Sequence, residues 1–159
     1  WAESQARQSE ARPWPWADTW PVAKLDIPEQ GVSMIVLEGV HGESLAFGPG
    51  RVPGSEGPGA PVVLAGHRDT HFRHLQHLEP GDAVRLQGMD RQWRRYQVTA
   101  TRVVDSSRES LDTRSLAQDT LVLITCYPFD SLDASGTLRY VVEAKPAYGM
   151  EQIDTVAAL

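Results

Sequence analysis

The residues in this chain that could carry out chemistry centre on its one cysteine, Cys126. It ends the apolar, β-branched run Leu121–Thr125 and precedes a turn that contains Pro128. A thiol held at the end of a buried strand can face a cleft and, once deprotonated, act as a nucleophile. The alternative is a small apolar side chain in the core, a common role for a free cysteine.

Two further residues complete a set suited to acyl transfer. His67 follows shortly after the apolar run 61–65, and Arg139 lies inside the run 138–144. A cysteine is mostly protonated at neutral pH, so a nearby imidazole can take the thiol proton and later return a proton to a leaving amine. An arginine offers a fork of charged donors for an oxyanion or a substrate carbonyl. Cys126, His67 and Arg139 are therefore the candidate catalytic residues.

Strands must position these residues. Short β-branched runs bounded by Gly, Pro or Asp predict strands at residues 22–27, 32–37, 61–65, 83–86, 93–104, 121–125 and 138–144. Residues 48–59 hold five glycines and three prolines and are predicted to form a loop. The spacing of Phe72, Leu75 and Leu78 predicts one or two helical turns. No rhythm of strand and long helix appears, so the predicted fold class is all-β, a closed barrel or a sandwich.

The N-terminal residues have a different character from the rest. Residues 1–12 favour helix but have almost no apolar face. Residues 13–21 combine three prolines with Trp14, Trp16 and Trp20. We expect residues 1–21 to form a helix tail and a Trp/Pro-rich belt that packs onto one domain, residues 22–159. Contact of the belt with a membrane surface or a partner is the alternative.

Composition excludes several classes of function. The net charge is −6, from 15 basic and 21 acidic residues, and the basic residues cluster only at Arg91–Arg95. A nucleic-acid-binding protein needs a broader basic face, so no nucleic acid is expected as a partner. A single cysteine excludes an internal disulfide and a multi-cysteine zinc site. The sequence also lacks an apolar run of about 18 residues, the length needed for a spanning helix.

A histidine cluster invites a metal interpretation. His67, His71, His74 and His77 lie close together with Asp69 among them, and His71 follows His67 by four positions. Helical spacing of that kind can converge two ligands. Against it, no His-Glu-x-x-His pattern is present, and a glycine directly before His67 disfavours a helix there. We expect no metal and no cofactor, with the later histidines in a solvated or half-buried turn and Asp69 capping the short helix.

Three separated motifs resemble those of the sortase family. These are Gly66-His67, Leu123-Ile-Thr-Cys126 and the strand that begins Leu138-Arg139, in this order, and the resemblance spans residues 22 to 146. Sortases carry a Thr-Leu-x-Thr-Cys motif, whose first threonine is replaced here by Val122, a position that we expect to serve strand packing. The stretches 14–21 and 66–72 also look like the sortases of Gram-negative bacteria that are called class GN.

The resemblance implies a cysteine transpeptidase built on a closed β-barrel of seven to eight strands with short helices in the loops. Such an enzyme cleaves a C-terminal sorting signal of the Leu-Pro-x-Thr-Gly type and passes the acyl end to an amine. By motif position, Cys126 would be the nucleophile, His67 the proton carrier and Arg139 the stabiliser of substrate or oxyanion, with Thr125 beside the site. The substrate-binding residues are not identified by the motifs.

The resemblance also implies partners and a location. The substrate would be a surface protein that bears a sorting signal, and the amine acceptor is not indicated. Because sortase substrates arrive across a membrane, we expect an apolar anchor upstream of Trp1 and a site facing the periplasm or extracytoplasmic side. Two alternatives stay open: a cysteine peptidase or amidase that uses water as acceptor, and a β-barrel binding module with a buried cysteine.

Overall fold

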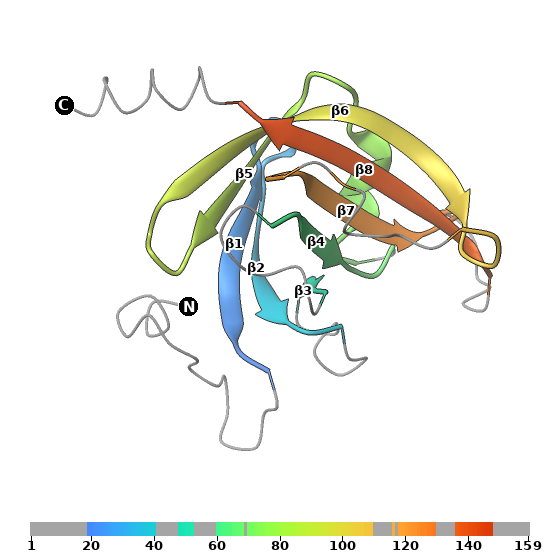
Figure 1. Cartoon of the computed structure of the whole chain (residues 1–159), viewed down its shortest axis with the longest axis horizontal. Helices are drawn as coiled ribbons and strands as arrows, with labels where there is room; N and C mark the ends of the chain where they lie inside the picture. Colours follow the sequence, from blue (N-terminus) through green and yellow to red (C-terminus); the bar gives the residue numbers. More distant parts are fainter. Residues whose placement is uncertain are drawn as a thin grey trace.

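The computed structural model describes residues 19–40, 48–52, 60–68, 70–109, 116, 118–129 and 136–147. Within them, eight strands close into a barrel in the spatial order β1-β2-β3-β4-β7-β8-β6-β5 (Figure 1). The predicted all-β closed barrel with short helices is thus confirmed. The strands are β1 Pro21–Ile27, β2 Val32–Glu38, β3 Gly50–Arg51, β4 Val62–Ala65, β5 Ala83–Gly88, β6 Trp93–Asp105, β7 Leu121–Cys126 and β8 Leu138–Pro146, and the short 3₁₀ helices are η1 Pro28–Gln30 and η2 Arg73–His77.

The predicted strands agree with the observed ones within a few residues at each end. The loop prediction for residues 48–59 was wrong at one point, because Gly50–Arg51 form the short strand β3. This strand pairs in parallel with the end of β2, where Leu37 lies opposite Gly50, and in antiparallel fashion with β4. Gly50 and Arg51 show no strand pattern in the sequence. The position of β3 is therefore determined by its pairing with β2 and β4.

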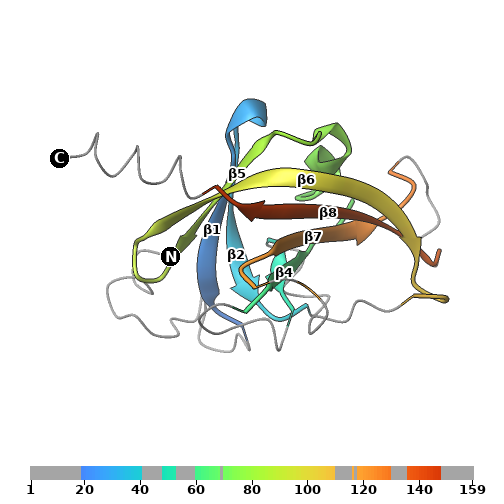
Figure 2. The same cartoon turned by 45° about the horizontal axis from the view of Figure 1, so that its top comes forward.

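The pairing of β4 with β7 brings distant segments together. These strands run in parallel, with Val62–Ala65 opposite Leu121–Ile124. β8 then continues the sheet in antiparallel fashion on the other side of β7 (Figure 2). Because β4 and β7 are parallel, their carboxyl ends lie at the same edge, and the residues that follow them are neighbours.

Strand alternation separates an inner core from a smaller outer cluster. Inside the barrel, Leu64, Leu123 and Val142 belong to one cluster and are fully buried. On the opposite face of the same strands, Val63, Val122 and Val141 form a second buried cluster. Val122 is 0% exposed, so the valine in place of the motif's threonine is a packing residue, as predicted.

The segment after β4 uses its apolar residues to close the barrel. Phe72, Leu75 and Leu78 are 0%, 0% and 2% exposed and belong to the main core. A 3₁₀ helix has three residues per turn, so side chains spaced by three lie on one face. The predicted helical turn is therefore confirmed in η2, Arg73–His77.

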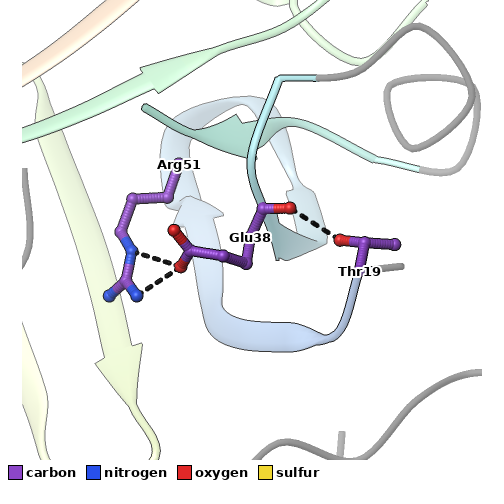
Figure 3. Close-up of polar contacts among 3 residues, drawn as sticks. All are labelled: Thr19, Glu38 and Arg51. Carbon is purple, nitrogen blue, oxygen red and sulfur yellow. Dashed lines mark hydrogen bonds and ion pairs between the residues drawn. The ribbon is translucent and has the colours of Figure 1, made fainter. Parts of the chain in front are cut away.

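A polar contact fixes the start of the described chain. The Thr19 hydroxyl, 2% exposed, donates a 2.7 Å hydrogen bond to the carbonyl oxygen of Glu38 at the end of β2. The Glu38 carboxylate in turn forms an ion pair with the Arg51 guanidinium on β3 (Figure 3). Trp20, the one belt tryptophan that the structure describes, packs against the main core. The division of the chain at residue 21 stays a prediction, because residues 1–18, with Trp14 and Trp16, lie outside the described residues.

Across the described ranges, no helix has the length and apolar character needed to cross a membrane.

Candidate active site

Cys126 lies at the last position of β7 and is half-buried. Alternation along β7 places Leu121, Leu123 and Thr125 toward the barrel interior, and Val122 and Ile124 toward the outer cluster. Cys126 shares the outer face with Val122 and Ile124. The thiol is therefore not an interior packing residue, which argues against the role of a plain core cysteine.

Arg139 lies directly across from Cys126 in the antiparallel register of β7 and β8. Residues in register on neighbouring strands share a face, so the guanidinium belongs to the outer side with the thiol. Its Nη1 donates to the carbonyl oxygens of Gly136 at 2.7 Å and Leu138 at 2.9 Å. These bonds hold the side chain against the start of its own strand, beside the end of β7.

The alternative role for Arg139 is structural, in an ion pair with an acidic side chain. Glu143, the candidate partner on the same strand, instead pairs with Arg102 at 3.3 Å. The other two candidates, Asp130 and Asp133, lie outside the described residues. The contacts of Arg139 that the structure shows are thus to backbone carbonyl oxygens. These neutral groups hold the guanidinium in place without an ion pair to an acidic side chain among the described residues.

His67 is placed by the parallel pairing of β4 and β7. The amide of Gly66 donates to the carbonyl of Ile124 at 3.2 Å, which continues the strand pairing one residue past β4. The Thr125 hydroxyl donates to the Gly66 carbonyl at 2.7 Å, and Thr125 is 3% exposed. The residue before His67 is therefore bonded on both sides to the two residues before Cys126. His67 itself is exposed.

The backbone around His67 folds into a tight turn. The His67 carbonyl accepts hydrogen bonds from the amides of Thr70 at 3.4 Å and Phe72 at 3.0 Å. A Cβ atom on Gly66 would lie 2.9 Å from the ring of the fully buried Phe72. Only glycine lets the chain approach the ring this closely, so Gly66 sets where the backbone turns and where His67 stands.

The other histidines lie in and beside η2. His71 and His74 are half-buried and His77 is exposed, as predicted for a solvated or half-buried turn. Burial lowers the pKa of His71, and the neighbouring charge of His67 lowers it further. Burial, followed by the charges of Arg73 and His77, lowers the pKa of His74. Both shifts favour neutral imidazoles.

No group of three or more His, Cys, Asp or Glu side chains in the described part of the chain is arranged to hold a metal ion. The helix-capping role expected for Asp69 falls on a residue outside that part.

Two hollows adjoin the candidate residues. One, of about 260 Å³, lies on the outer side of β6, β7 and β8 and includes Arg139. Its floor is apolar, and Arg102 and Glu109 at its rim approach to 3.7 Å. Its remaining lining residues are Val104, Ser106, Ile124 and Val141. Sequence reasoning missed this set, although alternation in the predicted strands places several of these residues on one face.

The second hollow, of about 440 Å³, lies beside the turn that follows Cys126. Three aromatic rings contribute to it: Tyr127 stacks on Tyr140 at 6.1 Å between ring centroids, and Phe129 meets Tyr140 edge-on at 5.1 Å. Gln76 from η2 and Pro128 complete its lining. The three rings thus pack together at the turn that follows Cys126 in the sequence.

Comparison with known families shows which family the chain belongs to. The family model of the sortase domain matches residues 25–147. The chain belongs to the sortase family. This membership confirms the family that the sequence motifs indicated.

Individual sortases agree with this result. Sortase D from Bacillus subtilis (strain 168) is 34% identical over 123 residues, which make up 76% of this chain and 61% of that protein. The chain thus spans less than two thirds of the length of this relative.

Solved sortase structures share the fold of the domain. The lid mutant of sortase A from Corynebacterium diphtheriae superposes with a TM-score of 0.68 at 26% identity, covering 83% of this chain and 73% of that one. Sortase C-1 from Actinomyces oris gives a TM-score of 0.65 at 28% identity, covering 80% of this chain and 72% of that one. The sortase domain is thus the barrel described above.

Proposed function

We propose that the protein cleaves a C-terminal sorting signal of the Leu-Pro-x-Thr-Gly type and joins the new acyl end to an amine. Cys126 is the nucleophile, His67 carries the proton and Arg139 stabilises the substrate carbonyl or its oxyanion. The observation that carries this proposal is the convergence of three segments at one strand edge. Cys126 and Arg139 are register partners, and the residue before His67 is bonded to Ile124 and Thr125.

The proposed reaction has two steps. The Cys126 thiolate attacks the threonine carbonyl carbon; the S–C bond forms, the Thr–Gly C–N bond breaks, and protonated His67 gives its proton to the departing glycine amine. An acceptor amine then attacks the thioester. The new C–N bond forms as the C–S bond breaks, and the amine proton passes to His67. We assign to Arg139 the donor to the oxygen that becomes negative in each step.

The hollow that includes Arg139 supports binding of an extended peptide beside the thiol. Its apolar floor is formed by Val104, Ile124 and Val141, and it lies on the same outer face as Cys126. A branched apolar side chain of the sorting signal fits such a floor, because burial of apolar area favours binding. We assign the signal residues upstream of the scissile bond to this hollow.

A cysteine peptidase or amidase that uses water is the second candidate. It shares every step up to the thioester and differs only in the acceptor. The polar and aromatic hollow beside Tyr127 and Gln76 is open enough for an amine to approach. Water would reach the same place, so the acceptor must be decided by reaction products.

The deciding experiment incubates the chain with a Leu-Pro-x-Thr-Gly peptide and a panel of amines, and reads the products by mass. The proposal expects an amide product whose yield rises with amine concentration, and no product from Cys126→Ala. Release of free acid that no amine accelerates would support the hydrolase. Undiminished turnover by a folded Cys126→Ala would remove the cysteine from the reaction.

Thiol alkylation tests the third possibility, a binding module with an inert cysteine. A core thiol reacts slowly with iodoacetamide, whereas a nucleophilic thiolate reacts fast. The half-buried position of Cys126 at a strand end favours the second outcome. Alkylation no faster in the folded chain than in a buried-thiol reference protein would contradict the proposal.

The remaining assignments rest on the family and on sequence motifs. We propose a surface protein with a sorting signal as substrate, a membrane location through an anchor upstream of Trp1, and a site on the periplasmic or extracytoplasmic side. Membership of the Gram-negative class GN is supported by the segments 14–21 and 66–72. A full-length reading frame without an apolar segment of about 20 residues near its start would contradict the anchor.

A further inference from the structure

Three charged side chains meet at the rim of the hollow that includes Arg139. Arg102 on β6 pairs through Nη2 with the Glu143 carboxylate at 3.3 Å, and its Nη1 lies 3.7 Å from the Glu109 carboxylate. Arg102 and Glu109 line the hollow, whereas Glu143 is not part of the lining that the described residues form. One edge of the guanidinium is therefore anchored on the sheet, and the other edge faces the hollow.

Strand register places Arg102 on the same outer face as the thiol. Arg102 lies opposite Val141, a member of the outer cluster, and Val141 lies opposite Ile124 on β7. Cys126 is two residues beyond Ile124, and β6, β8 and β7 lie side by side in that order (Figure 2). Two strand spacings and two residues therefore separate Arg102 from Cys126, which corresponds to about 12 Å between their Cα atoms.

The contact with Glu109 is the weaker of the two ion pairs of Arg102. At 3.7 Å it is too long for a hydrogen bond, and the Glu109 side chain is 61% exposed, against 27% for Glu143. Ion pairs between exposed side chains contribute little to stability. The amide of Glu109 donates a 2.9 Å hydrogen bond to the Asp105 carbonyl, so the backbone is held and only the side chain must rotate to leave Arg102.

The other cations near the rim have different surroundings. Arg139, the other arginine that lines the hollow, donates from Nη1 to two backbone carbonyl oxygens at the start of β8. Arg108 faces Asp105 at 3.9 Å in the turn after β6. Of the two arginines in the lining, Arg102 is thus the one that already faces a carboxylate across the rim. The protein itself places an anionic group at the Nη1 edge of Arg102.

We propose that Arg102 selects sorting signals that carry an acidic side chain at the variable position x of Leu-Pro-x-Thr-Gly. This selection rests on the function proposed above, which brings the threonine carbonyl of the signal to Cys126. Residue x directly precedes that threonine, and an extended peptide rises about 3.3 Å per residue. The long side chains of Arg102 and of a glutamate at x span the remaining distance along the outer face.

A carboxylate at x takes the place of the Glu109 carboxylate. The substrate oxygen accepts from the Nη1 edge of Arg102 at hydrogen-bond distance, which the Glu109 carboxylate does not reach in the free protein. Glu143 keeps the opposite edge of the guanidinium in place, and the Glu109 side chain turns into solvent. Glu109 therefore competes with the substrate for Arg102. Removing Arg102 abolishes the preference for an acidic x, whereas removing the charge of Glu109 strengthens it.

The test compares three peptides that differ only at x, which is glutamate, glutamine or lysine. Their dissociation constants are measured by NMR titration of Cys126→Ala, in which no turnover disturbs the equilibrium. We expect the glutamate peptide to bind about five-fold more tightly than the glutamine peptide at low salt, and the lysine peptide to bind most weakly. Added salt should reduce the preference. Equal binding of the three, binding of none, or tightest binding of the lysine peptide would overturn the proposal.

Charge variants in the same Cys126→Ala background identify the residue responsible. Arg102→Gln should remove the preference for glutamate, and Glu109→Gln should increase it about two-fold. Arg108→Gln makes the same charge change as Arg102→Gln in the adjacent turn, at a side chain that is 85% exposed, and should keep the preference. A preference that survives Arg102→Gln would overturn the proposal. If Arg102→Gln does not fold, Glu109→Gln decides, and an unchanged preference in that variant would overturn the proposal.

Cleavage by the chain with intact Cys126 separates this selection from the reaction itself. The proposal expects kcat/KM to follow the same order as binding, with the glutamate peptide highest. Cleavage of all three peptides with equal kcat/KM would leave the reaction in place and overturn the selection by Arg102. If no peptide is cleaved, with or without an amine, but binding still prefers glutamate through Arg102, the proposed reaction is wrong and the acidic subsite at the rim is retained.

Discussion

The hydroxyl of Thr125 donates a 2.7 Å hydrogen bond to the carbonyl oxygen of Gly66, 59 residues earlier in the chain. This bond joins the residue before Cys126 to the residue before His67. Thr125 is 3% exposed, so no water replaces the donor if the hydroxyl is removed. The relative position of the two proposed catalytic residues therefore depends on one buried side chain as well as on backbone pairing.

Thr125→Val should separate this role from packing, because valine keeps the shape and loses the donor. An unsatisfied buried carbonyl typically costs about 1–3 kcal/mol in the free energy of unfolding. We also expect lower turnover per folded molecule, since His67 is no longer fixed against β7. Urea unfolding and peptide cleavage on the same sample measure both. Thr125→Ser is the control, and equal stability of the valine and serine variants would show that the bond contributes nothing.

Gly66→Ala should place a methyl group against the ring of Phe72. The added Cβ would lie 2.9 Å from two ring carbons of a fully buried side chain, which must shift. Overpacking of this kind costs about 1–3 kcal/mol and should displace the turn that holds His67. Gly136→Ala is the matched control, because nothing lies within 4 Å of its added Cβ. Similar melting temperatures for the two variants would contradict the close approach.

His67→Ala should reduce turnover by at least about 10²–10⁴-fold, the usual contribution of general acid–base catalysis. His71→Ala, His74→Ala and His77→Ala should each change turnover little, because these residues lie in or before η2 rather than at the strand edge. Steady-state cleavage of the same peptide compares the four variants. If His71→Ala proved as damaging as His67→Ala, a metal site would regain support, and loss of wild-type activity on adding a chelator would be the check.

Stability should fall on acidification, in part through His71. Burial, followed by His67, lowers the pKa of His71 in the folded state, so the unfolded chain binds the proton more readily. The contribution is complete above the unfolded pKa of about 6.5 and is lost as pH falls through the folded value. His71→Gln should therefore flatten the dependence of the unfolding free energy on pH below neutrality. The control is His77→Gln, a variant at an exposed histidine. If the unfolding free energies of His71→Gln and His77→Gln depended on pH in the same way, the expectation would be wrong.

Arg139→Lys tests geometry apart from charge. Lysine keeps the charge but replaces a planar fork of donors with one mobile point. If Arg139 stabilises an oxyanion, the variant should lose about 10²–10³-fold in acylation, and Arg139→Ala should lose more. Melting temperature and single-turnover acylation are measured on one sample. A destabilised but fully active lysine variant would make Arg139 a structural residue.

Much of the barrel could be predicted from local pattern. The strands are apolar, β-branched runs between turn residues. The spacing of three between Phe72, Leu75 and Leu78 predicts the helical turn that the structure shows as η2. β3 could not be predicted, because Gly50 and Arg51 pair only where β2 and β4 leave room for them. A two-residue strand is a property of its neighbours.

The site was less accessible to local reasoning. Alternation divides β8 into two faces, but it does not say which one faces the interior, so the orientation of Arg139 needed the closed barrel. The segments that carry His67 and Cys126 come together through the parallel pairing of β4 and β7. This pairing joins residues that are far apart in sequence, so local sequence patterns do not predict it. The family motifs suggested this gathering before any geometry did. The hollow on the outer face was missed because Arg102, Ile124 and Arg139 come from three separate strands.

The parallel pairing of β4 with β7 also bears on how the chain folds. Contacts between residues this far apart in sequence form only after a long loop has closed, and loop closure costs conformational entropy. Such contacts therefore slow folding and are expected to form late in the folding reaction. The thiol should consequently gain its histidine neighbour only when most of the barrel has formed. During refolding, the rise in Cys126 alkylation rate should then coincide with the final native phase, so a nascent chain carries a largely unreactive cysteine until its barrel is closed.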